Sequence, residues 1–344
     1  MGIKQLTALI RLKSPESIQT VGLYTYTGKC VAIDTSIFVY RSLTNIRHNG
    51  LALYNKEDKV VSHIIGLFHK TVQYLSIGIR PIYILDGKPP EEKGACIQIR
   101  NKRAQECRDK IAQTVDPVEK QRLASMSIRI NKSHIDDLKH LFNLMGVSYI
   151  QSDSEAESYA GELCRIGYVD AVVSEDMDTL LYGPTTLIRQ CIDKSIKRKD
   201  AITTFNMDKI LQDFQMTMAE FTDVCILCGC DYCCTIPTIG YQRAYQNIKA
   251  YGSIENIISS GKYTIPDEFK ANYPRARELF QIFRDKLEPD TIPIVSSEIQ
   301  YDELHAYLVQ GCDMNPNIVK NALTKIQRGQ TTYVKFDCIP HILD

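Results

Sequence analysis

The sequence lacks tryptophan, a net charge and any long apolar run: 41 Lys and Arg residues balance 41 Asp and Glu residues. A neutral chain gives no global argument for nucleic-acid binding, so a DNA-binding surface would have to be local. No segment reaches the ~18 apolar residues of a membrane span. The N-terminus has no apolar segment of the signal-peptide type, and we expect a reducing compartment, cytosol or nucleus.

Twelve cysteines are present, and the densest run lies between Cys225 and Cys234. In isolation this run resembles a zinc or iron–sulfur site. No second pair of Cys or His follows at zinc-finger spacing. The alternative is a packed helix in which free cysteines act as small hydrophobic residues. The lack of a second pair favours this alternative.

Seven carboxylates stand out because most of them follow short apolar runs. They are Asp34, Asp86, Glu155, Glu157, Asp176, Asp178 and Asp231. Short β-branched runs are typical of buried parallel strands, and open α/β sheets bind ligands at the carboxyl ends of such strands. Acidic residues gathered there need a cation, and oxygen ligands favour Mg²⁺. The sequence therefore predicts a metal site.

The same patterns predict an α/β fold with a mostly parallel central sheet flanked by helices. We expect strands at 29–34, 80–86, 147–150, 171–174 and 186–189. We expect helices at 2–10, 36–43, 62–74, 133–145 and within 207–234, with a loop at 44–59.

Residues 91–132 are rich in Lys and Arg and poor in large apolar residues, which predicts helices outside the core. Further along, Pro237 and Gly240 form a turn that opens a helix. This is the pattern of a helix–turn–helix, whose backbone N–H groups can hold a phosphate without reading sequence.

Six segments in order resemble signatures of the flap endonuclease branch of the XPG-like structure-specific nucleases. They are Met-Gly-Ile, Val-Ala-Ile-Asp34, Leu-Asp86-Gly-Lys-Pro-Pro, Ser-Glu155-Ala-Glu157, Glu-Asp176-Met-Asp178 and Gly-Cys-Asp231-Tyr-Cys. The resemblance runs from Met1 to about Gln330, and all seven carboxylates coincide with metal-binding positions of the family.

This resemblance implies a PIN-like nuclease core with a helical arch and a C-terminal helix–turn–helix. The implied regions are 1–108 with the start of an arch at 91–132, 125–255 with the helix–turn–helix at 228–255, a helical extension at 256–329 that packs on the core, and a tail at 330–344.

The implied chemistry is phosphodiester hydrolysis by two Mg²⁺ ions, with K⁺ as a further candidate at the helix–turn–helix. By analogy Asp86, Glu155, Glu157 and Asp176 lie nearest one Mg²⁺ ion, and Asp178 and Asp231 lie nearest the other. Asp34 completes the cluster. Lys93 and Arg100 match basic residues at the base of the arch, where they would neutralise the scissile phosphate.

The implied DNA-binding residues come from the arch, the helix after the first strand, and the hairpin. They are Tyr40, Arg47, Arg103, Arg129, Lys132, Gly229, Gly240 and Arg243. Tyr40 would stack on a base; the alternative is a core tyrosine beside Phe38.

Two segments depart from the family pattern. Thr238 stands where the family has the first glycine of Gly-Ile-Gly, and a Thr there restricts the turn, so we expect weaker duplex anchoring or a compensation. The tail from Gln330 to Phe336 only partly matches a sliding-clamp motif and lacks a basic extension, which would suit a viral or otherwise diverged copy. A sliding clamp is a candidate partner, and we expect a monomer.

The sequence favours a 5′ flap endonuclease and 5′→3′ exonuclease acting in replication or repair. Three alternatives remain: a nuclease for bubbles, nicks or junctions, a non-catalytic DNA- or clamp-binding protein, and a small-molecule phosphohydrolase. The short loop after Asp86 favours flaps, and the complete carboxylate set argues against a non-catalytic protein. We expect a nuclear protein, in the host nucleus if viral, with a cytoplasmic replication site as the alternative.

Overall fold

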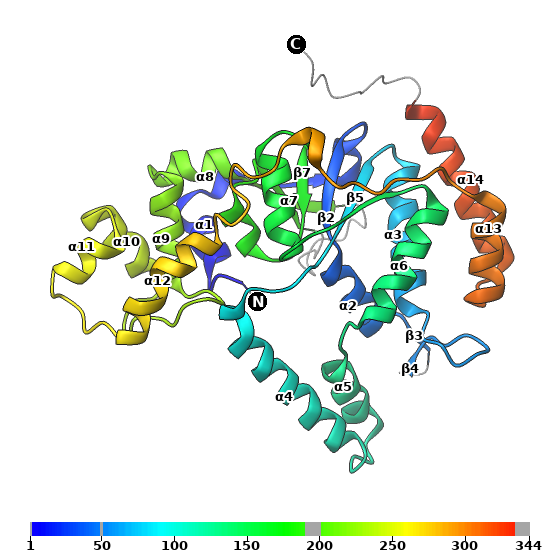
Figure 1. Ribbon diagram of the computed structural model, residues 1–344, viewed down its shortest axis with the longest axis horizontal. Coiled ribbons are helices and arrows are strands. Elements are labelled where there is room, and N and C mark those ends of the chain that lie inside the picture. The colour runs from blue at the N-terminus through cyan, green and yellow to red at the C-terminus, as the bar shows by residue number, and fades with distance from the viewer. Residues whose placement is uncertain (1, 49–50, 190–200, 334–344) are drawn as a thin grey trace. The chain divides into compact units, whose positions relative to one another are not determined.

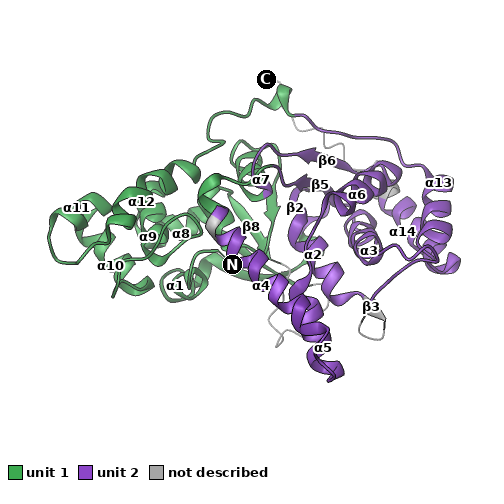
Figure 2. Ribbon diagram, turned by 60° about the horizontal axis from the view of Figure 1, so that its bottom comes forward, with its two compact units in different colours: residues 1–25, 88–93, 157–292 green, residues 26–87, 94–156, 293–344 purple. Residues whose placement is uncertain are grey.

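The computed structural model describes residues 2–48, 51–189 and 201–333. The chain divides into two compact units, each assembled from separated segments (Figure 2). The first unit comprises Met1–Thr25, Lys88–Lys93 and Glu157–Ile292, and the second comprises Tyr26–Gly87, Gly94–Ala156 and Pro293–Asp344. Among the described residues, no helix is both long and apolar enough to cross a membrane.

Four strands of the first unit lie in the order β1, β9, β8, β7. They are β1 (Ile18–Gly22), β7 (Ala171–Val173), β8 (Thr186–Arg189) and β9 (Ala201–Asn206). Strand β7 pairs with β8 in parallel, whereas β8 with β9 and β9 with β1 are antiparallel. The sequence did not predict β1 or β9, because a pair of adjacent polar residues, Gln-Thr in β1 and Thr-Thr in β9, interrupts the apolar residues of each strand.

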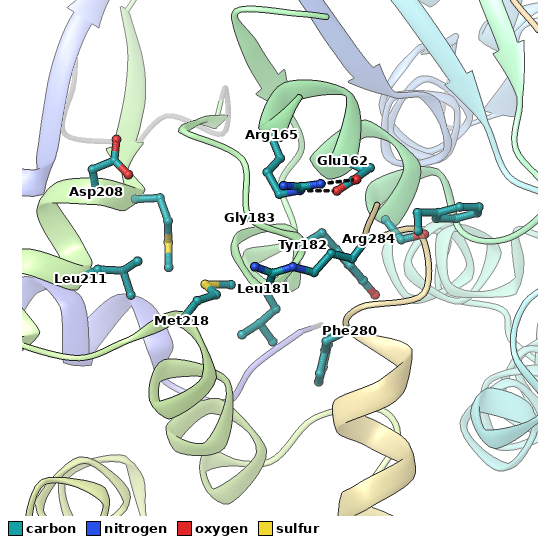
Figure 3. Close-up of a pocket in the computed structure, with 13 residues that line it drawn as sticks. Glu162, Arg165, Leu181, Tyr182, Gly183, Asp208, Leu211, Met218, Phe280 and Arg284 are labelled. Carbon is teal, nitrogen blue, oxygen red and sulfur yellow. Dashed lines mark hydrogen bonds and ion pairs between the residues drawn. The ribbon is translucent and has the colours of Figure 1, made fainter. Parts of the chain in front are cut away.

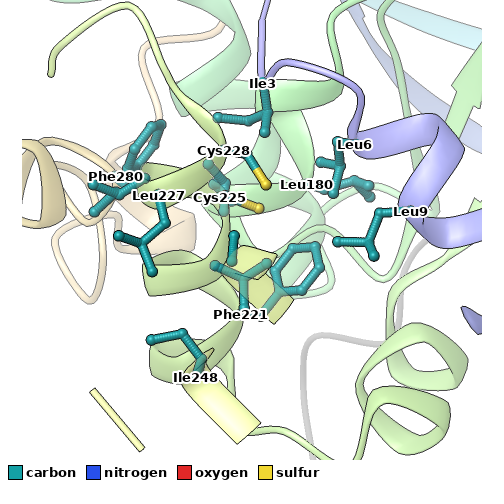
Figure 4. Close-up of a cluster of buried hydrophobic side chains, with 14 of the residues drawn as sticks. Ile3, Leu6, Leu9, Leu180, Phe221, Cys225, Leu227, Cys228, Ile248 and Phe280 are labelled. Carbon is teal, nitrogen blue, oxygen red and sulfur yellow. The ribbon is translucent and has the colours of Figure 1, made fainter. Parts of the chain in front are cut away.

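The helices of the first unit surround a large apolar core. They are α1 (Leu6–Lys13), α7 (Ala156–Arg165), α8 (Met207–Phe214), α9 (Met218–Cys228), α10 (Tyr241–Tyr251), α11 (Ile254–Ser259) and α12 (Asp267–Leu279). Figure 4 shows how Leu6 and Leu9 of α1 meet Phe221 of α9 in this core.

Two expected helices of this unit have different bounds. The N-terminal helix begins at Leu6 rather than at residue 2, because the preceding residues contact the carboxylate cluster and Gln5 is left-handed, with φ 58°. The expected helical stretch 207–234 breaks between α8 and α9. Gln215, with φ 50°, ends α8, and Thr217 caps α9 through a reciprocal pair with Glu220.

Three strands of the second unit, in the order β2, β5, β6, are all parallel. They are β2 (Cys30–Asp34), β5 (Arg80–Leu85) and β6 (Ser148–Gln151). Apart from a short hairpin of β3 (Arg47–His48) with β4 (Leu51–Ala52), three of the five described strand pairings within the two units are parallel, and the predicted α/β fold with mostly parallel strands is confirmed. The expected loop at 44–59 instead contains this hairpin.

The helices of the second unit include the predicted pair outside the core. They are α2 (Thr35–Asn45), α3 (Ser62–Ser76), α4 (Gly94–Ile111), α5 (Pro117–Ser127), α6 (Lys132–Met145), α13 (Tyr301–Ala306) and α14 (Pro316–Tyr333). Tyr83 of β5 stacks on Phe142 of α6 at 4.2 Å between ring centroids. Helices α4 and α5 pack on each other and bury few residues, as expected from the charged composition of 91–132 (Figure 1).

Candidate active site

Three predicted metal ligands form a tight cluster in the first unit. Asp176 and Asp178 follow β7, and Glu157 lies in the first turn of α7. Each offers one carboxylate oxygen, and these oxygens lie within 4.8 Å of one another. Glu157 and Asp178 are buried, so the cluster concentrates negative charge where water screens it poorly. The local geometry therefore suits a cation with oxygen ligands.

Asp178 is the most deeply placed of the three, with 3% of its surface exposed. Burial raises its pKa well above the usual range, and the neighbouring Asp176 and Asp231 raise it further. The backbone N–H of Ile3 donates to Asp178 Oδ1 at 2.5 Å and opposes this shift. A carboxylate in this position binds either a proton or a metal ion.

Lys93 supplies positive charge beside the cluster. Its Nζ lies 3.9 Å from Glu157 Oε1 and 3.8 Å from Asp231 Oδ2, and only 12% of its side chain is exposed. These separations are those of long ion pairs rather than close hydrogen bonds. The ammonium group therefore offsets part of the negative charge of the cluster.

The N-terminal segment also contacts the cluster, which the sequence patterns alone did not predict. Gly2 has φ 93°, and a Cβ atom there would lie 1.9 Å from Asp176 Oδ1. The N–H of Lys4 donates to the carbonyl of Gly229. Gly2 therefore allows both the left-handed backbone and the close approach. The Met-Gly-Ile signature was the available signal.

Three other predicted ligands, Asp34, Asp86 and Glu155, belong to the second unit. Asp34 ends β2 and caps α2, where its carboxylate accepts from the N–H of Ser36 at 3.2 Å. The Ser36 hydroxyl donates to Asp86, which also accepts from the N–H of Ala156 at 2.7 Å. Glu155 immediately precedes α7 and is half-buried. Ser36 thus connects two predicted ligands, a role that sequence reasoning missed.

Two family models match the chain: the XPG N-terminal domain over residues 1–107 and the XPG I-region over residues 146–231. Flap endonuclease 1-B of Physcomitrium patens is 35% identical over 334 residues, covering 95% of each chain. Flap endonuclease 1 of Danio rerio is 37% identical over 309 residues, covering 88% of this chain and 79% of the relative. The chain belongs to the flap endonuclease family.

Solved structures share the fold of the family. Flap endonuclease-1 from Methanococcus jannaschii aligns with a TM-score of 0.66 at 24% identity, over 92% of this chain and 96% of that one. The catalytic core of Rad2 in complex with DNA substrate aligns with a TM-score of 0.72 at 20% identity, over 94% and 100% of the two chains. At these identities the similarity establishes the architecture, and activity is argued from the residues.

The arch residues expected from the flap endonuclease family have different surroundings. Arg103 and Lys132 are exposed. Arg129 instead donates to the main-chain carbonyl of Arg100 and to Asn101 Oδ1, so its guanidinium holds the end of the arch against α4. Arg100 itself is half-buried on α4.

Tyr40 lies on α2 with 37% of its surface exposed, whereas Phe38 is buried. Tyr40 is therefore not a core residue, and its ring is available for stacking, although its contact with DNA stays a prediction. Arg47 lies on β3, and its side chain lies outside what the structure describes. The side chains of Gln330 and Tyr333, and all of residues 334–344, likewise lie outside the described residues.

The helix–turn–helix residues fall into two groups. Gly240 is the N-cap of α10, and Arg243 lies in the first turn of this helix; both are exposed. Gly229 is buried at the end of α9 with φ 107°. The contact between Gly229 and Lys4 gives Gly229 a packing role, and its predicted DNA contact stays a prediction.

The cysteines near the helix–turn–helix behave as packed thiols. Cys225 and Cys228 are buried on α9 among apolar side chains (Figure 4). Burial raises the pKa of Cys228 to about 12, so its thiol keeps its proton at neutral pH. Among the described residues, the grouping of side chains that could hold a metal ion consists of carboxylates, Glu157, Asp176 and Asp178, and includes no cysteine.

A separate pocket of about 250 Å³ opens in the first unit between α7, α8 and the segment after α12 (Figure 3). Glu162 accepts two hydrogen bonds from Arg165 along its wall, each 2.7 Å long. None of the predicted metal or DNA ligands lines this pocket. The carboxylate cluster, rather than this cavity, is therefore the candidate active site.

Proposed function

We propose that this protein is a Mg²⁺-dependent, structure-specific 5′ flap endonuclease and 5′→3′ exonuclease. It hydrolyses DNA phosphodiesters near junctions of single and double strands. The cluster of Glu157, Asp176 and Asp178 carries this proposal, because their oxygens lie within 4.8 Å of one another in a chain that belongs to a nuclease family. Hydrolases with such acidic clusters use divalent cations.

The donor set fits two Mg²⁺ ions, since every predicted ligand offers a hard carboxylate oxygen. Glu157, Asp176, Asp178 and Asp231 would supply ligands from the first unit. Asp34, Asp86 and Glu155 of the second unit stay predicted ligands. When bound, the metal ions supply a nucleophilic hydroxide and stabilise charge on the phosphate.

The chain's own residues prepare this chemistry. The Ile3 N–H donates to one Asp178 oxygen and so restricts the orientation of the carboxylate. Lys93, held between Glu157 and Asp231, places a positive charge where the scissile phosphate would bind. Arg100 would add a second positive charge from α4. The potassium ion that the resemblance implies at the helix–turn–helix stays a prediction.

A cleavage assay tests the proposal. A 5′-labelled flap, a nicked duplex and a small phosphoester are each incubated with Mg²⁺ or EDTA, using wild type, Asp178→Ala and Asp267→Ala. Asp267 is a matched control, because its side chain is 98% exposed on α12. We expect Mg²⁺-dependent flap cleavage that only Asp178→Ala abolishes. Wild-type protein that cuts no DNA would refute the function, and preferential cutting of the nick would select the junction-type alternative.

The sliding clamp, the monomeric state and the nuclear localisation stay predictions. We propose clamp binding through Gln330 to Phe336, and loss of binding on Phe336→Ala would support it. Fluorescent tagging in cells would test the nuclear localisation, and light scattering would test the monomer.

A further inference from the structure

The pocket of the first unit shown in Figure 3 has the composition of a small-molecule site. Ligand pockets are typically concave and largely apolar, with a few polar groups that fix the orientation of the ligand. An apolar cavity of about 150 Å³ holds one benzene ring. At about 250 Å³, this pocket has room for a single ring with a short chain. Its large apolar side chains are Leu181, Met207, Leu211, Met218, Phe280 and Phe283.

The pocket contains two guanidinium groups, and only one of them is paired. Arg165 donates two hydrogen bonds to Glu162, each 2.7 Å long, and one to Asp285 at 2.6 Å. Among the described residues, the side chain of Arg284 forms no hydrogen bond and no ion pair. Figure 3 shows this side chain reaching in among the other lining residues. The N–H donors of Arg284 therefore stay available to a ligand.

The backbone that carries Arg284 is anchored on both sides. The ring of Phe283 meets the ring of Tyr159 edge to face, with 5.2 Å between the centroids. On the other side, the N–H of Asp285 donates to the buried carboxylate of Glu162 at 2.9 Å. Tyr159 and Glu162 both lie on α7, so two contacts to one helix position the cation. A positioned cation loses less freedom when a ligand binds than a mobile one does.

The charges around the pocket favour a ligand that carries a single negative charge. Glu162 and Asp285 already surround the guanidinium of Arg165. Asp208 adds an exposed carboxylate from the first turn of α8. The carboxylates thus outnumber the guanidinium groups, and a phosphate dianion would be repelled more strongly than a monoanion. A carboxylate also matches the fork of Arg284 through two parallel hydrogen bonds.

We propose that this pocket binds a small carboxylic acid with one ring, its carboxylate on Arg284 and its ring against the apolar lining. The pocket shares two elements with the carboxylate cluster. Helix α7 carries Glu157, and the 3₁₀-helix η4 (Met177–Tyr182) carries Asp178. A bound acid would therefore contact elements that position predicted metal ligands. The proposal is independent of the proposed function, because neither DNA nor Mg²⁺ takes part in the binding.

The test is a titration of the whole chain, labelled at its methionine methyl groups, followed by NMR in EDTA without DNA. The probe is 3-phenylpropanoate. Its amide, 3-phenylpropanamide, has the same size without the charge, and acetate has the charge without the ring. We expect a Kd between about 10 µM and 1 mM for the acid, and a Kd at least about fivefold higher for the amide. Acetate should cause no shift at about 5 mM.

The methionine signals locate the ligand. We expect shifts of Met207 and Met218, which line the pocket, and no shift of Met126, which is exposed on α5. Single replacements of Met207 and Met218 by Leu assign their signals. Shifts confined to methionines outside the pocket would overturn the proposal. So would a Kd of the acid above about 5 mM, or equal binding of acid and amide. Tighter binding of phenyl phosphate than of the acid would overturn the choice of a carboxylate.

Variants then test the role of the unpaired guanidinium. Arg284→Ala should weaken binding of the acid about tenfold and change binding of the amide by less than about twofold. Lys286→Ala is the matched control, because this exposed lysine of the same segment does not line the pocket, and we expect a change within about twofold. Arg284→Lys keeps the charge without the fork and should fall between Arg284→Ala and wild type.

Circular dichroism verifies that each variant is folded. Equal losses in Arg284→Ala and Lys286→Ala would overturn the proposal, because overall charge rather than this site would then attract the acid. A protein that cuts flaps but binds no acid would overturn this proposal alone. A protein that binds the acid but cuts no DNA would support it while refuting the proposed function.

Discussion

Asp178 and Asp223 are equally buried carboxylates of the first unit, each 3% exposed, but the charged groups next to them differ in sign. Burial raises the pKa of both. Around Asp178 the nearby charges include Asp176 and Asp231, which raise its pKa further. Around Asp223 the Arg277 guanidinium lowers it. One carboxylate is left requiring an external cation, whereas the other is neutralised within the fold.

The geometry at Asp223 explains why this carboxylate needs no external cation. Arg277 donates from Nε and Nη2 to the two oxygens at 2.9 and 2.8 Å, and the Ile254 N–H donates a third bond at 3.2 Å. This forked pair joins α9, α11 and α12. Burial alone therefore does not identify a functional carboxylate, whereas burial among other carboxylates does.

The largest expected effect is the loss of catalysis in Asp178→Asn. We expect flap cleavage to fall at least about a thousandfold, or roughly 4 kcal/mol of transition-state stabilisation. In EDTA the variant should unfold at higher temperature than the wild type, because the substitution removes buried repulsion. Mg²⁺ should raise the melting temperature of the wild type more than that of the variant. A variant less stable than wild type in EDTA would contradict the comparison.

Asp223→Ala should show the opposite pattern. Removing one partner leaves Arg277 without its buried counter-charge, and we expect a loss of about 3 kcal/mol or more in the free energy of unfolding. Denaturant titration measures this loss. Activity per folded molecule should stay within about twofold of wild type, since Asp223 contacts no predicted ligand. A tenfold fall in activity of the folded variant would show that the two carboxylates are coupled.

The sequence predicts these two carboxylates to different degrees. Asp178 follows an apolar strand, and its motif matches a family signature, so both its place and its role could be predicted. Asp223 lies inside the apolar helix α9, and its partner Arg277 is 54 residues away, a separation that no local pattern encodes. Strands β1 and β9 were missed because adjacent polar residues interrupt their apolar residues, and because they pair with each other across a long separation in the sequence that no local pattern encodes.

The third-largest effect is expected for Lys93→Met, which removes the ammonium group beside the carboxylate cluster. We expect kcat to fall by about a hundredfold, as for removal of one preorganised charge in other active sites. Circular dichroism and the melting temperature check that the variant is folded, so that a loss of activity is not a loss of structure. Single-turnover cleavage with excess enzyme separates this loss from weaker DNA binding. A pure rise in KM with unchanged kcat would assign Lys93 to substrate binding instead.

The smallest effect is expected at Glu255, the second partner of Arg277, whose side chain is 48% exposed. Hydrogen bonding to Arg277 lowers the Glu255 pKa to about 2. A lowered carboxylate pKa stabilises the fold above the unfolded value and loses that effect as the pH falls through the folded value. Solvent screening limits the contribution of this exposed pair to less than about 1 kcal/mol.

Glu255→Gln should therefore be slightly less stable than wild type at pH 7, and the difference should shrink as the pH falls from 4.5 toward 2. Denaturant titrations at several pH values measure this difference. A loss as large as that of Asp223→Ala would mean that Arg277 depends on both carboxylates equally, and burial would then not be what distinguishes them.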